Sequence, residues 1–241
     1  MTSRVSRTRP TAASEGSGVG EGRLSVYGDS YSYMTARHAL ADEGSYYSAV
    51  NPTIDTAVGY GAIATYVTTT PFFLISNTGA AGGRSIFLDS LKMLVTVVPA
   101  SATNWKFLIE AASNTRLTTA PTGGAEATVV NVNPSSSNDF PGEVWSGTGG
   151  TVLTVGAGTD KRIISQGRIA HAIPVALDEL MIVFGQHDGG QSGSAAVVQR
   201  RTGYAAPCVI PPGCSAAIHM YGTSNAITGI SFEFELNMWA R

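Results

Sequence analysis

Two pairs of residues have side chains and spacing that could support metal or acid–base chemistry. His187 and Asp188 are adjacent in a glycine-rich stretch, where they could ligate a metal or polarise a substrate. Aspartate and glycine also favour turns, so a turn after a strand is the simpler interpretation. Glu233 and Glu235 occur in an alternating segment, which puts them about 7 Å apart on one strand face. That pair could serve glycoside hydrolysis, but a solvated or subunit-facing row of carboxylates is commoner.

A third candidate is Ser30, in the segment Gly28-Asp29-Ser30 that follows an apolar residue. The segment resembles the nucleophile block of the SGNH/GDSL hydrolases, a family that also needs a Gly-x-Asn-Asp block and a C-terminal Asp-x-x-His. Asn138-Asp139 lacks the glycine, and none of the four histidines has an aspartate three residues before it. Because a serine without a base is a poor nucleophile, the sequence predicts no enzyme activity.

The remaining candidates concern ligand contact and thiol chemistry. Trp145 lies in a Gly-rich stretch, where we expect no strand, and is a candidate contact for a sugar ring, although packing is the default for tryptophan. Cys208 and Cys214 flank Val-Ile-Pro-Pro-Gly, and a tight loop there could bring them within disulfide distance. Two unpaired thiols packed in a strand are the favoured alternative. Two cysteines alone make a poor zinc site, so no metal or cofactor is predicted.

Strands must position these residues. In residues 228–241 apolar side chains alternate with Ser, Glu and Asn, a period typical of a strand with one buried face. Similar segments precede it, including residues 61–70, 85–98 and 162–173, while one short helix is expected within 34–41. Roughly ten short strands with turns between them predict an all-β antiparallel sandwich or barrel.

The N-terminal 22 residues differ from the rest of the chain. Arg4, Arg7 and Arg9 precede the first acidic residue, Glu15, in a segment with almost no large apolar groups. Such a segment cannot offset its chain entropy alone, so we expect an extended arm that orders on a partner. No apolar run follows these arginines, which argues against a secretory signal, and no apolar run elsewhere is long enough to predict a membrane span.

Residues 23–241 are expected to form a single β-sandwich domain, with a Gly/Ser/Asn-rich insertion near 118–150 that carries contacts. Only 13% of all residues are charged, about half the fraction in typical soluble domains, which suits a subunit packed against neighbours. The net charge of −2 argues against nucleic-acid binding except through the arm.

Five segments carry a family resemblance through their order. They are Thr70-Pro-Phe-Phe-Leu-Ile-Ser-Asn77, Ser85-Ile-Phe-Leu-Asp-Ser-Leu-Lys-Met-Leu-Val-Thr-Val97, Arg168-Ile-Ala-His-Ala-Ile-Pro-Val-Ala-Leu-Asp178, Val209-Ile-Pro-Pro-Gly-Cys-Ser-Ala-Ala-Ile-His219 and Phe-Glu-Phe-Glu-Leu-Asn-Met-Trp-Ala-Arg241. This order is similar to jelly-roll virion structural proteins of tailed bacteriophages, over roughly residues 60–241. The resemblance implies a jelly-roll-like β-sandwich in a virion assembled in the host cytoplasm. It favours a capsid decoration or cement subunit that forms a symmetric homo-oligomer and contacts other virion proteins such as the major capsid protein.

Two alternatives stay open. A receptor- or glycan-binding module of a tail fibre or adhesin predicts an exposed aromatic site around Trp145 and Tyr46/Tyr47. A shell-forming capsid protein predicts that the arginines of the arm touch nucleic acid, although three arginines are few for a packaged genome.

Overall fold

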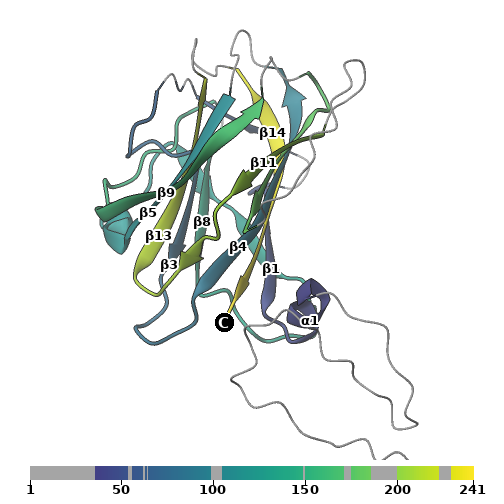
Figure 1. Cartoon of the computed structure of the whole chain (residues 1–241), viewed down its shortest axis with the longest axis vertical. Coiled ribbons are helices and arrows are strands. Elements are labelled where there is room, and N and C mark those ends of the chain that lie inside the picture. Colours follow the sequence, from purple (N-terminus) through teal and green to yellow (C-terminus); the bar gives the residue numbers. More distant parts are fainter. Residues whose placement is uncertain are drawn as a thin grey trace, which may run out of the picture.

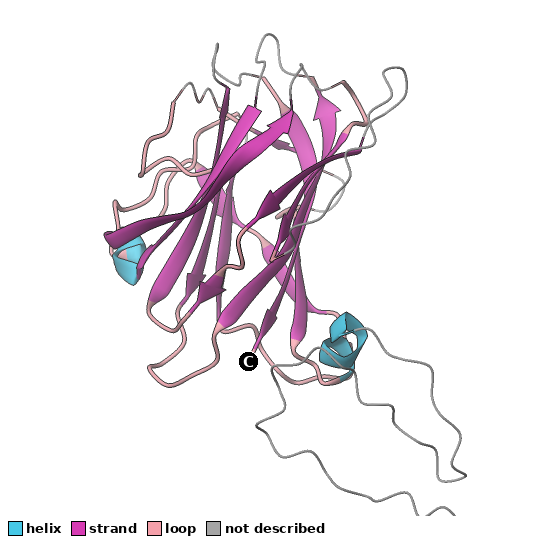
Figure 2. Cartoon of the chain, viewed as in Figure 1, coloured by secondary structure: helices cyan, strands magenta, loops and turns pink. Residues whose placement is uncertain are grey.

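The computed structural model describes residues 36–53, 56–61, 63, 65–98, 105–148, 150–170, 175–185, 200–222 and 229–241. Figures 1 and 2 show two facing sheets with helices only at the periphery. The elements are α1 (Ala36–Asp42), β1 (Tyr46–Val50), β2 (Val58–Gly59), β3 (Phe73–Asn77), β4 (Ile86–Val97), β5 (Trp105–Ser113), η2 (Asn114–Leu117), β6 (Gly124–Glu126), β7 (Thr128–Asn131), β8 (Gly142–Gly147), β9 (Thr159–Ala170), β10 (Glu179–Phe184), β11 (Arg200–Ala205), β12 (Val209–Ile210), β13 (Cys214–Gly222) and β14 (Ser231–Ala240). The predicted all-β class is confirmed, and the expected short helix is α1.

Eight of these strands pair in the nested order of a jelly roll. The first pairs with the last (β1 with β14), then β3 pairs with β13, β4 with β10, and β5 with β9, all antiparallel. Pairs β14–β4 and β13–β5 join these into two four-stranded sheets, β10-β4-β14-β1 and β3-β13-β5-β9. We call them the first and second sheet. The fold is therefore an antiparallel jelly-roll sandwich with additional strands at its edges.

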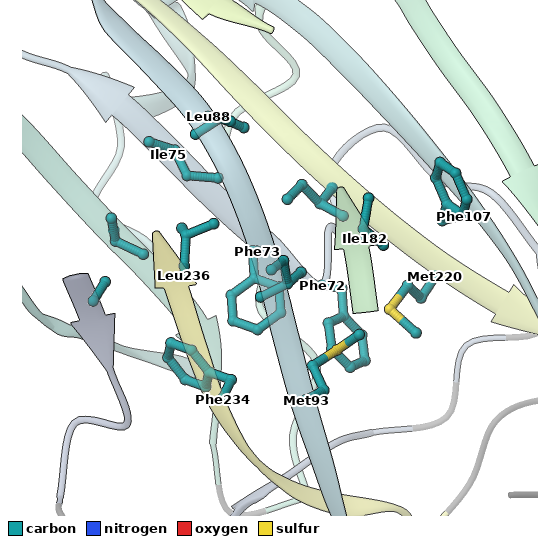
Figure 3. Packing of buried hydrophobic residues seen from close by; sticks show 14 of the residues in the cluster. Phe72, Phe73, Ile75, Leu88, Met93, Phe107, Ile182, Met220, Phe234 and Leu236 are labelled. Atoms are coloured by element: carbon teal, nitrogen blue, oxygen red, sulfur yellow. The ribbon is translucent and has the colours of Figure 1, made fainter. Parts of the chain in front are cut away.

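One hydrophobic core fills the space between the two sheets. In β14 the side chains of Phe232, Phe234, Leu236 and Met238 are buried while the residues between them are half-buried, which confirms the predicted alternation. Figure 3 shows Phe234 and Leu236 among apolar side chains from other strands, including Phe73. The Phe73 and Phe234 rings meet edge to face with centroids 4.8 Å apart.

Extra strands extend both sheets at their edges. On one side the insertion at 118–150 adds β7 to β1 of the first sheet, adds β8 to β3 of the second, and adds β6 to β8. On the other side β11 runs parallel to β10, and Ala206 N donates to Ser165 Oγ of β9 at 3.2 Å. The outermost strands are therefore β7 and β11 in the first sheet and β6 and β9 in the second.

Two sequence-based expectations were wrong. Residues 61–70 form no strand in their described part; Thr70 N donates to Val67 O in a turn, and Tyr66 and Thr68 direct their hydroxyls at Glu110. Trp145 lies inside β8, because the Gly-rich insertion supplies a strand to the edge of β3. The predicted N-terminal arm, residues 1–22, lies outside the described residues.

Candidate functional site

The outward face of the first sheet carries a row of aromatic side chains, of which Tyr46 is buried and Phe87 and Trp239 are half-buried. Tyr46, Trp239 and Phe87 stand side by side on β1, β14 and β4, at paired positions in the register. The Phe87 and Trp239 rings stack in parallel, with centroids 3.7 Å apart. Because each ring covers a face of the other, this pair is a packed platform rather than an open aromatic slot.

Helix α1 is joined to this aromatic row through the carboxylate of Asp89. Arg37 Nη2 donates to Asp89 Oδ1 at 2.9 Å, Arg37 Nε lies 2.7 Å from Oδ2, and Tyr46 Oη donates to Oδ2 at 2.6 Å. The hydrogen bond to Asp89 raises the pKa of Arg37. Burial, and then the bond to Asp89, raise the pKa of Tyr46. Both partners of the carboxylate therefore keep their protons, and α1 is fixed to the sheet.

Further along the same face lies a groove of about 560 Å³, which we call the acidic groove. Leu94 of β4 is flanked by Glu233 on β14 and Glu179 on β10 in one row, and Glu235 stands opposite Lys92 in the next. Asn51 forms part of the wall; its Oδ1 accepts a hydrogen bond from Phe234 N at 2.7 Å. The groove thus combines an apolar floor with carboxylate rims, a surface suited to an extended cationic segment.

The outward face of the second sheet is different, because loops bury its central strands β13 and β5. Glu110 and Arg116 form an ion pair with side chains 1% and 0% exposed. Tyr66 Oη also donates to Glu110, and Thr68 Oγ1 donates to its Oε1 at 2.9 Å. Arg116 Nη1 donates to the carbonyl oxygens of Thr68 at 2.7 Å and Gly156 at 3.3 Å. This buried network ties three separate loop segments to the sheet.

His219 of β13 borders the same network. Its ring lies 4.9 Å from that of Tyr66, edge to face. Burial lowers the pKa of His219 to about 3, with the Arg116 charge acting in the same direction and a backbone hydrogen bond at Thr70 opposing it. The imidazole is therefore neutral near neutral pH.

The residues singled out from sequence are dispersed. Arg4, Arg7, Arg9, Ser30, His187 and Asp188 lie outside the described residues. Cys208 and Cys214 are free thiols; Cys208 is buried, which raises its pKa to about 12. Trp145 is half-buried against an apolar cluster on the second sheet, and its Nε1 donates to Glu143 Oε2 at 3.0 Å.

Sequence reasoning missed both ion pairs. Arg37 and Asp89 are separated by 52 positions, and no local pattern joins them. Glu110 and Arg116 are six apart, but the turn of η2 between them places them together rather than any helical or strand period. Of the groove residues, only Glu233 and Glu235 could be found from the sequence, because their two-residue spacing on a predicted strand puts both on one face.

The described part of the chain contains no group of three or more His, Cys, Asp or Glu side chains placed to hold a metal ion. None of its helices has the length and apolar character to cross a membrane. Comparison with protein-family models, with curated proteins and with solved structures finds no match to this chain.

Proposed function

We propose that the chain is a non-enzymatic structural subunit of a virion, of the capsid decoration or cement type. It assembles with copies of itself by symmetric contacts and docks on other virion proteins through its N-terminal arm. The observation that carries this proposal is an apolar cluster at one end of the first sheet, the end patch, formed by Val97, Val98, Val175 and Leu177. All four side chains are exposed, by 40–57%.

The end patch lies where the backbone pairing continues beyond β10. Leu177 N donates to Val95 O at 2.8 Å, and Val95 N donates to Asp178 O at 2.9 Å. The loop before β10 therefore runs beside the end of β4 that bears Val97. Contiguous exposed apolar surface is typical of protein contact sites.

Within the end patch, the backbone conformation and exposure of Leu177 are the strongest indication of a contact site. Its backbone is left-handed, with φ of 70°, and its side chain is 57% exposed. A left-handed backbone costs a non-glycine residue about 1–2 kcal/mol, and an isolated subunit gains nothing from an exposed leucine there. Burial of Leu177 in a contact between subunits accounts for a leucine at this exposed, left-handed position.

The fold adds support by analogy. Double-sheet jelly rolls recur in viral capsid proteins and in lectins, although a fold does not fix a function. Extra strands extend both sheets at their edges, and we infer that copies associate through the end patch rather than by adding strands.

Sedimentation equilibrium of the full chain over a wide concentration range tests the proposal. We expect a discrete oligomer that Leu177→Asn and Val175→Ser weaken. Ile163→Thr is the matched control, because Ile163 is also 57% exposed but lies on β9 of the second sheet, away from the end patch. A monomer at all concentrations would refute self-assembly, and equal weakening by all three variants would refute the end patch as the contact.

A further inference from the structure

The acidic groove and the end patch lie on the same sheet, but the groove has a different character. Its rims bear Glu233 and Glu235, two residues apart on β14, and its floor bears Leu94. Side chains two positions apart on a strand project in the same direction about 7 Å from each other. Lys92, opposite Glu235, is the basic side chain that lines the groove.

The chain enters the described structure on this same face. Helix α1 begins at Ala36, and Arg37 holds it against Asp89 of β4. Asp89 precedes Lys92 by three positions on the same strand, a separation of about 10 Å. Figure 1 shows α1 beside β1, at the edge of the sheet whose outward face carries the groove. The N-terminal segment thus departs from a point close to the groove.

The length of that segment is more than sufficient to return to the groove. Between Arg9 and Ala36 lie 26 residues, which span up to about 85 Å when extended. Joining the ends of such a tether costs little entropy and holds the arginines at a high effective concentration near their own groove. A second copy would have to compete with this tethered segment.

The chemistry of the arm matches the groove. Arg7 and Arg9 are also two residues apart, so an extended segment would present both guanidinium groups in one direction at the spacing of Glu233 and Glu235. Pro10 favours an extended backbone at Arg9. Guanidinium and carboxylate groups form forked, charge-assisted hydrogen bonds.

We propose that the acidic groove is a binding site for the arginine-bearing segment of the same chain, residues 4–10, with Arg7 and Arg9 paired to Glu233 and Glu235. The arm is held by its own body until another surface takes it. This inference concerns the arm that the proposed function uses for docking, but it does not require that the protein assembles.

Carbodiimide cross-linking of the full chain tests the site. Arg7→Lys and Arg9→Lys keep the charge and introduce amines that a carbodiimide can couple to a nearby carboxylate. Mass spectrometry should find these positions joined to Glu233 or Glu235. Glu126 and Glu143 are the matched control, because they are a second pair of neighbouring carboxylates. Burial, and then the charge of Glu143, raise the pKa of Glu126. Coupling to the control pair with equal yield, or no coupling to the groove, would overturn the proposal.

Two further measurements keep the test independent of assembly. Mixing isotopically light and heavy chains shows whether an arm binds its own chain or another copy. Cross-links that join light to light or heavy to heavy support the proposal. Mixed light–heavy cross-links as the main product would overturn it. Glu233→Gln with Glu235→Gln should abolish groove cross-links without changing the sedimentation mass. If Arg7→Lys with Arg9→Lys sediments as a monomer but still gives the groove cross-links, that result counts against the proposed assembly alone.

Discussion

The buried pair of Glu110 and Arg116 allows a quantitative test of how the second sheet is covered. Arg116→Met removes the guanidinium but keeps much of the side-chain volume. The carboxylate of Glu110 then stays 1% exposed, with Tyr66 and Thr68 as its remaining hydrogen-bond partners. The carbonyl oxygens of Thr68 and Gly156 also lose their donor.

The expected loss is large because one charge remains buried without its partner. Breaking a buried pair in this way costs about 3–5 kcal/mol. For a domain of this size the melting temperature should fall by about 6–20 °C. The double variant Glu110→Leu with Arg116→Met should recover part of the loss, because no buried charge then remains.

Urea unfolding followed by circular dichroism measures these differences at constant pH. Arg37→Met is the matched control, since it breaks the pair with Asp89 whose arginine side chain is 51% exposed. An exposed pair contributes about 0–1 kcal/mol, so this variant should unfold near the wild-type midpoint. If Arg116→Met costs no more than Arg37→Met, the Glu110 carboxylate is hydrated and the buried network is not a source of stability.

Three further predictions follow from single positions. His219 binds a proton near its ordinary pKa of 6.5 when unfolded but only near 3 when folded, so its contribution to stability is lost as pH falls between these values, by about 1.4 kcal/mol per pH unit. Urea midpoints measured against pH should flatten over that range in His219→Gln, and identical slopes would contradict this origin. Leu177→Asn should stabilise the isolated subunit by about 1 kcal/mol in the same assay, because asparagine tolerates φ of 70° better than leucine; a destabilised subunit would show that Leu177 packs within its own chain. Gly203→Ala would place a Cβ 2.8 Å from the Phe107 ring and should cost about 1–3 kcal/mol in the same assay; an unchanged urea midpoint would mean that the ring moves aside freely.

The elements of this fold could be predicted where the residue pattern is local. The alternation in β14, the long apolar β4 and the short helix all follow from side-chain periods, and the structure confirms them. Residues 61–70 look like a strand because Thr and Val are frequent there, but this composition also suits a loop whose hydroxyls bond a buried carboxylate. Trp145 was placed outside a strand because glycines surround it, yet strand β3 offers an edge that β8 fills. Pairing with a distant strand overrides local propensity in such cases.

The candidate site was predicted only in part, for a related reason. Glu110 and Glu233 occupy equivalent outward positions on alternating strands, and their local sequences do not separate them. Loops that cover the second sheet bury Glu110, and burial of a carboxylate requires a partner, which Arg116 supplies. Glu233, in contrast, is half-buried and lines the acidic groove.

This asymmetry bears directly on how the protein can act. In the described part of the chain, loops bury the central strands of the second sheet, whereas the outward face of the first sheet keeps half-buried side chains on β4 and β14. The acidic groove lies on that face, and the end patch adjoins it at the end of β4. A partner that buries the end patch also approaches the groove, because Leu94 of the groove floor is three positions from Val97 on the same strand. Occupation of the groove by the arm and burial of the end patch are therefore neighbouring events, and charge neutralisation at Glu233 should lower the repulsion that an acidic partner meets there.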